Sequence, residues 1–255
     1  MSQNFICAAA AEPGRHIYIH PRNSSMQQAS YGRIRLNSSA PEVEFVNPAE
    51  ETGLICLQGT CSITLADERF TLGANDSLYI PKGCAIKIET DATVDLIEFS
   101  APVDGNYPVQ FIPYTAVLAD PKLHFAAGTP GAQRIINILF GSNIQAGRLV
   151  AGITRSLPGN WTSWPPHEHA KMLEEIYVYV DMPAPAFGLQ LVYTDEITPA
   201  QVDVVREGDA VLLPAGYHPN VAIPGSSLNF VWIMAAHREI EDRQWGVVQV
   251  DPNYA

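Results

Sequence analysis

The sequence contains few charged side chains and no excess of positive ones. Charged residues make up 16% of the 255 residues, and 15 lysines and arginines stand against 27 aspartates and glutamates. The formal net charge of −12 argues against the broad basic surface that nucleic acids and anionic membranes require. We therefore expect neither nucleic acid nor membrane as a partner, and an anionic substrate would need a local cluster of cations.

A basic leader, a long apolar run and paired cysteine motifs are also missing. The opening stretch MSQNFICAAAAEPGR has no basic residue before a very short apolar segment, so neither a secretory signal nor a transmembrane helix is predicted. Cys7, Cys56, Cys61 and Cys84 lack CxxC spacing, which favours free buried thiols over disulfides. We expect a cytoplasmic protein.

Glycine, proline and short strand-like segments dominate the rest of the sequence. The chain has 18 glycines and 20 prolines, and few windows sustain the helical i, i+3, i+4, i+7 pattern. Eight segments have strand character, namely 53–57, 62–65, 77–80, 92–99, 148–153, 176–180, 189–193 and 228–234. The pattern predicts an all-β fold, in the form of a sandwich, a jelly roll or a barrel.

An internal repeat indicates two tandem domains. Asp76-Ser-Leu-Tyr-Ile-Pro-Lys-Gly83 is matched by Asp209-Ala-Val-Leu-Leu-Pro-Ala-Gly216, and each copy is an acidic turn, four strand residues and Pro-x-Gly. An offset near half the chain is what a duplicated domain produces. We place the boundary near residue 125, within the turn-rich stretch 118–131, which predicts domains 1–125 and 126–255.

A segment in the second half has the spacing of a metal site. His167 and His169 are two residues apart, so on an extended chain both imidazoles project to one face. An acidic pair follows at the start of an apolar strand, where charges need partners or a metal, and His218 follows the second Pro-x-Gly. Two or three histidines with one carboxylate suit Zn, Mn, Fe, Co or Ni. The first copy has Ala85 in place of His218, so a metal site is predicted in the C-terminal half only.

These features together resemble a bicupin, and the C-terminal part resembles the 5-deoxy-glucuronate isomerase family of inositol catabolism. The segments that carry the resemblance are GNWTSWPPHEH (159–169), EEIYVY (174–179), FGLQLVYTD (187–195) and PAGYHP (214–219). It covers about residues 148–235, whereas the first half shares mainly the cupin-like layout. The uronate ketol-isomerases of pectin breakdown share a stretch like EIYVYVDMP (175–183), so their reaction stays an alternative.

The resemblance implies two tandem jelly-roll or β-barrel domains and a metal-dependent aldose-ketose isomerase, which is an intramolecular oxidoreductase of carbohydrate metabolism. The reaction would convert 5-deoxy-glucuronate to 5-dehydro-2-deoxy-gluconate. It also implies that His167, His169, a glutamate and His218 hold a divalent metal, for which we favour zinc over Mn, Fe, Co or Ni. The pectin-pathway pattern selects Glu175 and the commoner cupin spacing selects Glu174. Strand alternation lets only one of the two point inward, and we favour Glu175.

Three further residues are candidates for catalysis. Glu174 could shuttle the proton between the two carbons if a bend let it reach the pocket. Tyr179, or Tyr177 with the same strand parity, could donate to an oxyanion. Gln190 is a polar residue in an apolar strand, and its amide could orient a substrate hydroxyl.

Arg148 and Lys171 are the candidates for binding the carboxylate of a small-molecule uronate. A guanidinium offers a bidentate fork and an ammonium a point charge. Two other functions remain open from the sequence: an iron-dependent cupin dioxygenase on the same ligands, and a non-catalytic sugar-binding bicupin. A homo-oligomer is also expected, because a partner chain often covers exposed strand edges of jelly rolls.

Overall fold

The computed structural model of the protein describes residues 4–7, 12–194 and 200–255. Within these residues the chain forms 23 strands and a single short helix, α1 (Tyr114–Ala119), and the strands pair antiparallel. Each of the eight predicted strand segments overlaps an observed strand, and the all-β prediction is confirmed. No helix among the described residues is long and apolar enough to span a membrane. Asp195, the last residue of one family-like segment, lies outside the described residues.

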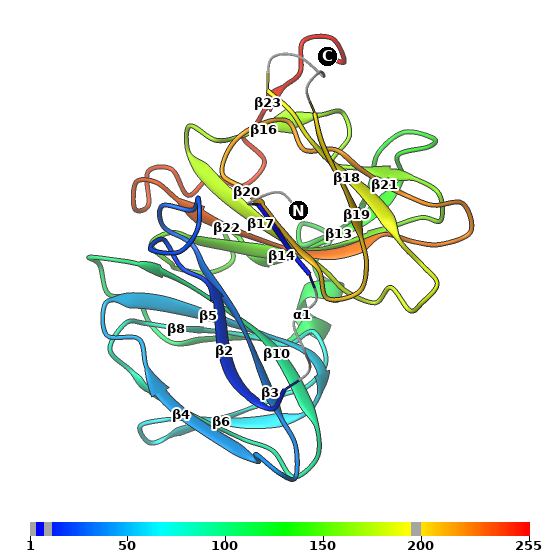
Figure 1. The fold of residues 1–255 in the computed structure, drawn as a ribbon. Coiled ribbons are helices and arrows are strands. Elements are labelled where there is room, and N and C mark those ends of the chain that lie inside the picture. The colour runs from blue at the N-terminus through cyan, green and yellow to red at the C-terminus, as the bar shows by residue number, and fades with distance from the viewer. Residues whose placement is uncertain (1–3, 8–11, 195–199) are drawn as a thin grey trace.

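The first half of the chain forms a sandwich of two sheets, drawn in blue and cyan in Figure 1. The larger sheet has the order β11 (Gln110–Ile112), β8 (Ser77–Ile80), β5 (Glu50–Gly59), β10 (Val94–Pro102), β3 (Ser30–Leu36), β2 (Gly14–Ile19). The smaller sheet has the order β4 (Glu42–Val46), β9 (Ala85–Glu89), β6 (Cys61–Leu65), β7 (Glu68–Leu72). Both sheets contribute to one apolar core, for example through Leu54 and Ile63.

The second half repeats this arrangement. Its larger sheet has the order β1 (Phe5–Ile6), β20 (Ala210–Leu213), β17 (Leu173–Tyr179), β22 (Asn229–Ala236), β14 (Leu149–Ser156), β13 (Arg134–Phe140), β12 (His124–Ala127). Its smaller sheet has the order β15 (Trp161–Thr162), β21 (Asn220–Ala222), β18 (Gly188–Val192), β19 (Gln201–Val205). A separate ribbon pairs β16 (His167–Glu168) with β23 (Gln249–Val250).

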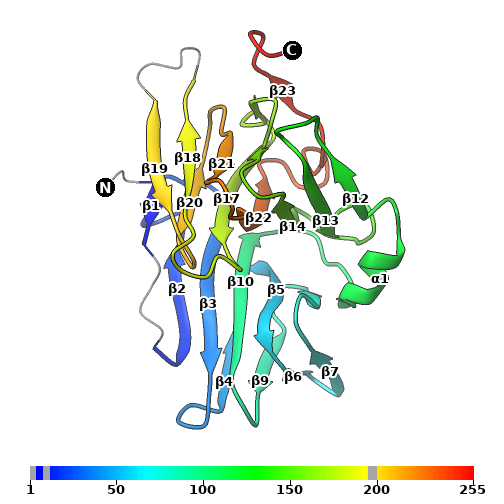
Figure 2. The same cartoon turned by 90° about the vertical axis from the view of Figure 1, so that its right-hand side faces the viewer.

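The two halves lie one above the other in Figure 2, and side chains of their two large sheets form a further apolar core that joins them. Successive residues of a strand face opposite sides of the sheet. On β17, Ile176 and Val178 therefore pack in this central core, whereas Tyr177 and Tyr179 pack inside the C-terminal sandwich. By the same alternation, the side chains of Glu174 and Glu175 at the start of β17 point in opposite directions.

One strand near the start of the chain crosses between the halves. In β1, Phe5 lies opposite Val211 and Ile6 opposite Ala210 of β20 in the C-terminal sheet. The position predicted as the domain boundary, residue 125, lies in β12, which pairs with β13 of that same sheet. The domain ranges 1–125 and 126–255 stay a prediction.

Two buried glutamates tie the halves together in equivalent ways. Glu51, the second residue of β5, accepts the backbone N–H groups of residues 147–149 and the Tyr79 hydroxyl, at 2.6 to 3.0 Å. Glu174, the second residue of β17, accepts the backbone N–H groups of residues 27–29 at 2.5 to 2.7 Å. Residues 147–149 lead into β14 and residues 27–29 lead into β3. Each half therefore supplies a carboxylate that satisfies the amides at the entry to a strand of the other half.

We expect Glu51→Gln and Glu174→Gln each to lower the free energy of unfolding by at least about 2 kcal/mol, because an amide replaces a charged acceptor of several buried donors. Denaturant unfolding of the purified variants measures this. Glu68→Gln, at the exposed first residue of β7, serves as the control and should change stability by less than about 0.5 kcal/mol. Losses no larger than that of the control would contradict the role assigned to these carboxylates.

Candidate metal centre

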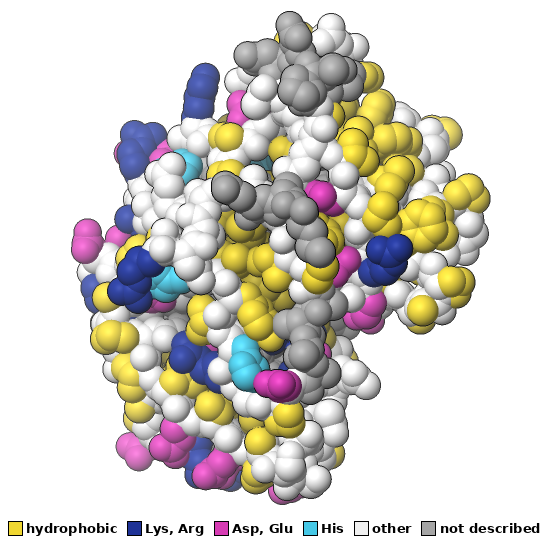
Figure 3. Space-filling view, viewed as in Figure 1, with side chains coloured by type: hydrophobic (Ala, Val, Ile, Leu, Met, Phe, Trp, Pro, Cys, Tyr) yellow, Lys and Arg dark blue, Asp and Glu magenta, His cyan; other side chains and the backbone are white. Residues whose placement is uncertain are grey.

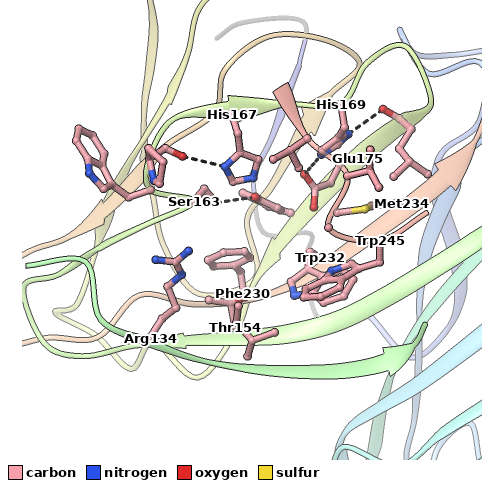
Figure 4. A pocket seen from close by; sticks show the side chains of 18 of the residues that line it. Arg134, Thr154, Ser163, His167, His169, Glu175, Phe230, Trp232, Met234 and Trp245 are labelled. Carbon is pink, nitrogen blue, oxygen red and sulfur yellow. Dashed lines mark hydrogen bonds and ion pairs between the residues drawn. The ribbon is translucent and has the colours of Figure 1, made fainter. Parts of the chain in front are cut away.

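Three histidines and one glutamate meet in the C-terminal sandwich. Figure 4 shows His167, His169 and Glu175 together, and the ring of His218 adjoins both histidine rings. Oε2 of Glu175, on β17, lies 3.0 Å from Nε2 of His169 and 3.2 Å from Nε2 of His218. Ligand atoms of these three buried residues lie within 4.8 Å of one another. His167, on β16, adjoins them, with its ring centroid 5.1 Å from that of His218 and 6.5 Å from that of His169. The predicted HxH pair, Glu175 and His218 thus come together in space.

All three imidazoles are held through Nδ1 by the backbone. For His167, His169 and His218, the accepting carbonyls are those of Pro165, Leu173 and Gly216, at 2.9, 3.0 and 2.8 Å respectively. A carbonyl can only accept, so Nδ1 must carry a proton, and in the neutral ring the lone pair is on Nε2. Metal-ligating histidines are oriented in this way, with the second nitrogen bound to a carbonyl or carboxylate.

The Nε2 atom of His218 gives a direct test of whether a metal fits. This atom is buried and makes no hydrogen bond of acceptable geometry to any described residue, although the Glu175 oxygen lies close by. A buried polar atom without a partner is costly. A divalent transition metal would use the Nε2 lone pair, and a donor set of imidazoles with one carboxylate suits such a metal. The residues present therefore fit a metal ion.

The protonation states of Glu175 and His167 also suit a bound cation. Burial opposes ionisation of Glu175, but the contacts from His169 and His218 outweigh it and lower its pKa to about 2. Burial, with a smaller effect of the neighbouring His218, lowers the pKa of His167 to about 4. For His169 burial favours the neutral ring, yet the Glu175 carboxylate outweighs it and raises the pKa. At neutral pH the cluster thus offers a carboxylate and a neutral imidazole, the forms that bind metals.

A cavity of about 270 Å³ adjoins the cluster. Its lining includes Arg134 and Ile136 of β13, Thr154 of β14, Tyr177 of β17, Phe230, Trp232 and Met234 of β22, and residues 245–248 and Val250. Ser163 Oγ and Tyr177 Oη lie 2.7 Å apart in its wall. Burial and the nearby Glu175 hold the pKa of Tyr177 well above its ordinary value, so the phenol stays protonated. The pairing of Val250 with His167 brings the C-terminal segment against the ligand cluster.

The three residues expected to act in catalysis lie outside this cavity. Glu174 points to the opposite side of β17 from Glu175, where residues 27–29 bind it, so no bend brings it to the pocket. The Tyr179 hydroxyl donates to Gln190 Oε1 at 2.6 Å, and Gln190 Nε2 donates to the His218 carbonyl at 2.9 Å. Tyr179 and Gln190 therefore support the backbone of His218 from behind, and a direct role in catalysis does not fit their positions.

Neither expected substrate cation lines the cavity. Arg148 donates to the backbone carbonyls of residues 102, 236 and 237 at the junction of the halves. Lys171 is exposed in the turn before β17. Arg134 does line the cavity, and the sequence reasoning missed it. The available signal was a lone cation at the start of the apolar strand RIINILF (134–140).

We expect Glu175→Gln to lower metal affinity by more than the roughly 10- to 100-fold typical of losing a hydrogen bond to a ligand, because charge and coordination are lost together. Chelator competition followed by elemental analysis measures the affinity. Glu174→Gln is the matched control, since it changes the adjacent residue on the other face, and its folded fraction should keep the metal. A larger loss of metal affinity in Glu174→Gln than in Glu175→Gln would indicate that Glu174 is the metal ligand.

The purified chain is expected to bind about one divalent metal ion, and His167→Ala and His218→Ala are each expected to reduce that content, because each removes one imidazole ligand. Elemental analysis after dialysis gives the stoichiometry. His124→Ala is a suitable control, because Nδ1 of His124 bonds Asn137 outside the cavity. Undiminished metal in both ligand variants would rule out the site.

The fold is that of solved cupin structures. An IolB-like protein from Salmonella typhimurium LT2 has a TM-score of 0.85 at 24% identity, covering 99% of this chain and 98% of that one. A cupin 2 conserved barrel domain protein from Leptotrichia buccalis has a TM-score of 0.54 at 16% identity, covering 90% and 92%. Bacillus subtilis oxalate decarboxylase, described with Mn(II) centres, has a TM-score of 0.61 at 14% identity, covering 87% and 73%. The predicted bicupin fold is confirmed.

The amino-acid sequence is also similar to those of curated proteins. The 5-deoxy-glucuronate isomerase of Geobacillus kaustophilus is 30% identical over 203 residues, which cover 73% of this chain and 72% of the relative. The enzyme of that name from Listeria monocytogenes is 26% identical over 252 residues, covering 89% and 90%. A family model, described as the KduI/IolB family, matches residues 5–255. The resemblance inferred from the C-terminal motifs thus extends over nearly the whole chain, which belongs to the KduI/IolB family.

Proposed function

We propose that this chain is a metal-dependent aldose-ketose isomerase that converts 5-deoxy-glucuronate to 5-dehydro-2-deoxy-gluconate in inositol catabolism. The observation that carries the proposal is the cluster of three imidazoles, each oriented by a backbone carbonyl, around Glu175. The cluster opens on a cavity of about 270 Å³, just below the roughly 300–1,000 Å³ usual for small-molecule pockets. Relatives that carry this isomerase name support the choice of reaction.

We propose that His167, His169, Glu175 and His218 hold the metal, with zinc ahead of manganese, iron, cobalt or nickel. Nitrogen ligands with a single carboxylate are common for zinc, although they also accept the other four ions. A bound divalent ion supplies Lewis-acid stabilisation of the negative charge that develops on the two substrate oxygens during ketol isomerisation.

Side chains of the cavity would orient the sugar and exclude water. The protonated Tyr177 hydroxyl and its neighbour Ser163 can donate to substrate oxygens. Trp232 and Trp245 stack with ring centroids 6.1 Å apart and form an apolar wall of the cavity. An apolar wall limits access of water, which strengthens electrostatic interactions inside the site.

The uronate ketol-isomerase reaction of pectin breakdown is the second candidate, because the stretch EIYVYVDMP (175–183) matches that group of enzymes as well. The two substrates are both deoxy-uronates, and both reactions need a metal-activated carbonyl and a proton shuttle.

A cytoplasmic location and self-association also belong to the proposal. All four cysteines lie in described residues and are free thiols, as is usual in a reducing compartment. Apolar side chains gather on the outer surface near β18 and β19 in Figure 3, and the edge strand β19 exposes Val202 and Val204. An exposed strand edge of this kind favours pairing with a second copy.

We expect the metal-loaded protein to isomerise 5-deoxy-glucuronate with a kcat/KM at least about tenfold above that for the pectin-derived 5-dehydro-4-deoxy-uronate, because a pocket fitted to one sugar acid leaves polar groups unpaired with the other. NMR of the products, with protein reconstituted in turn with Zn, Mn, Fe, Co and Ni, gives the rates. Chelation should abolish turnover. Oxygen uptake would instead indicate a dioxygenase, and binding without turnover would indicate a sugar-binding bicupin.

A further inference from the structure

Arg134 is set apart from the other arginines by what surrounds it. It is the first residue of β13 and alternates with Ile136, so both side chains line the cavity, beside Thr154 of β14. Among the described lining residues it is the one lysine or arginine. No carboxylate of the described residues lies within ion-pair distance of its guanidinium, and its side chain makes one hydrogen bond to them, from Nη1 to the Ala132 carbonyl at 2.9 Å.

Of the ten other arginines, Arg22, Arg69 and Arg206 are exposed, and the remaining seven are ion-paired or donate to several backbone carbonyls. Those with an acidic partner within 4.0 Å are Arg15, Arg33, Arg35, Arg155 and Arg238. Arg148 and Arg243 each donate to three backbone carbonyls. Arg134 is half-buried but has neither an acidic partner nor several carbonyl acceptors, and its burial lowers its pKa. A partly desolvated cation that lacks a protein anion is stabilised by an anionic ligand.

Arg134 and the histidine and glutamate cluster are placed to contact the two ends of one sugar acid. In Figure 4 its guanidinium lies at one side of the pocket and Glu175 with His169 at the other, with His167 and Ser163 between them. A hexuronate has its carbonyl at C1 and its carboxylate at C6, at opposite ends of the carbon chain. The planar guanidinium is the group best suited to bind a carboxylate through two parallel hydrogen bonds.

We propose that Arg134 forms the subsite for the carboxylate of the substrate, so that C6 lies at Arg134 while C1 and C2 lie at the histidine and glutamate cluster. This assignment deepens the proposed function and rests on it for the identity of the sugar acid. It also explains how a chain with a net charge of −12 can bind an anion: the attraction is short-range and lies inside the cavity, where solvent screens it little.

Binding and turnover of charged and neutral ligands test the subsite. Variants are Arg134→Gln, which removes the charge, and Arg134→Lys, which keeps the charge but not the fork. Arg155→Gln is the matched control, because Arg155 lies on the adjacent strand β14, outside the cavity and paired with Asp181. Ligands are 5-deoxy-glucuronate and 5-deoxyglucose, together with their C1-reduced forms, which cannot be isomerised and report binding alone by calorimetry.

For Arg134→Gln we expect KM for the uronate, and Kd for its reduced form, to rise roughly tenfold to a hundredfold, because a charge-assisted contact is lost. The neutral ligands and the metal content should be unchanged, Arg134→Lys should be intermediate, and Arg155→Gln should behave as wild type. The subsite would be overturned if both Arg134 variants preferred the acid over the neutral ligand as strongly as the wild type does. It would also be overturned if the wild type itself showed no such preference. If the wild type binds the reduced acid through Arg134 but isomerises nothing, the subsite stands and the isomerase function fails.

Discussion

The structure depends on two buried carboxylates that each satisfy backbone amides of the other half. An ionised carboxylate without water is stable only when hydrogen bonds surround it, and Glu51 and Glu174 obtain theirs from residues 147–149 and 27–29. These contacts fix where β3 and β14 begin relative to the opposite sandwich. Because neighbouring residues of a strand face opposite ways, anchoring Glu174 between the halves also aims Glu175 into the C-terminal cavity. Two consecutive residues thus contribute to different parts of the structure, Glu174 to the packing of the halves and Glu175 to the candidate metal centre.

The two halves use equivalent positions for different purposes. In the first half the residue after Glu51 is Thr52, whose hydroxyl accepts a hydrogen bond from Asn47 at 2.7 Å. Asn47 also contacts Glu98, and Arg15 donates two hydrogen bonds to Glu98 at 2.7 Å. Polar side chains of this half therefore satisfy one another. In the second half the residue after Glu174 is Glu175, whose carboxylate faces Nε2 of His169 and Nε2 of His218, so that ligand atoms of three side chains lie close enough to share an ion.

Much of the fold and of the ligand cluster could be predicted from the sequence, since both follow from local patterns. Strand alternation and turn residues locate the main strands, and the same alternation separates Glu175 from its neighbour. The surroundings of a side chain are harder to predict. Arg148 and Arg134 are both arginines. The guanidinium of Arg148 nevertheless binds backbone carbonyls of distant segments, whereas Arg134 faces the cavity. Gln190 is fully buried but lies one layer behind the pocket, where the Tyr179 hydroxyl and the His218 carbonyl bind its amide.

The pairing of β1 with β20 joins residues that are more than 200 positions apart, since Phe5 lies opposite Val211. During synthesis the N-terminal strand therefore leaves the ribosome long before its partner exists, and its edge must wait unpaired. The ribbon of β16 and β23 delays completion of the cavity still further, because β23 comprises Gln249 and Val250. Such distant pairings raise the contact order, which slows folding. The first sandwich can gain its own core early, but its junction with the second sandwich and the wall of the cavity beside the histidine cluster form only after β20 and β23 have been made.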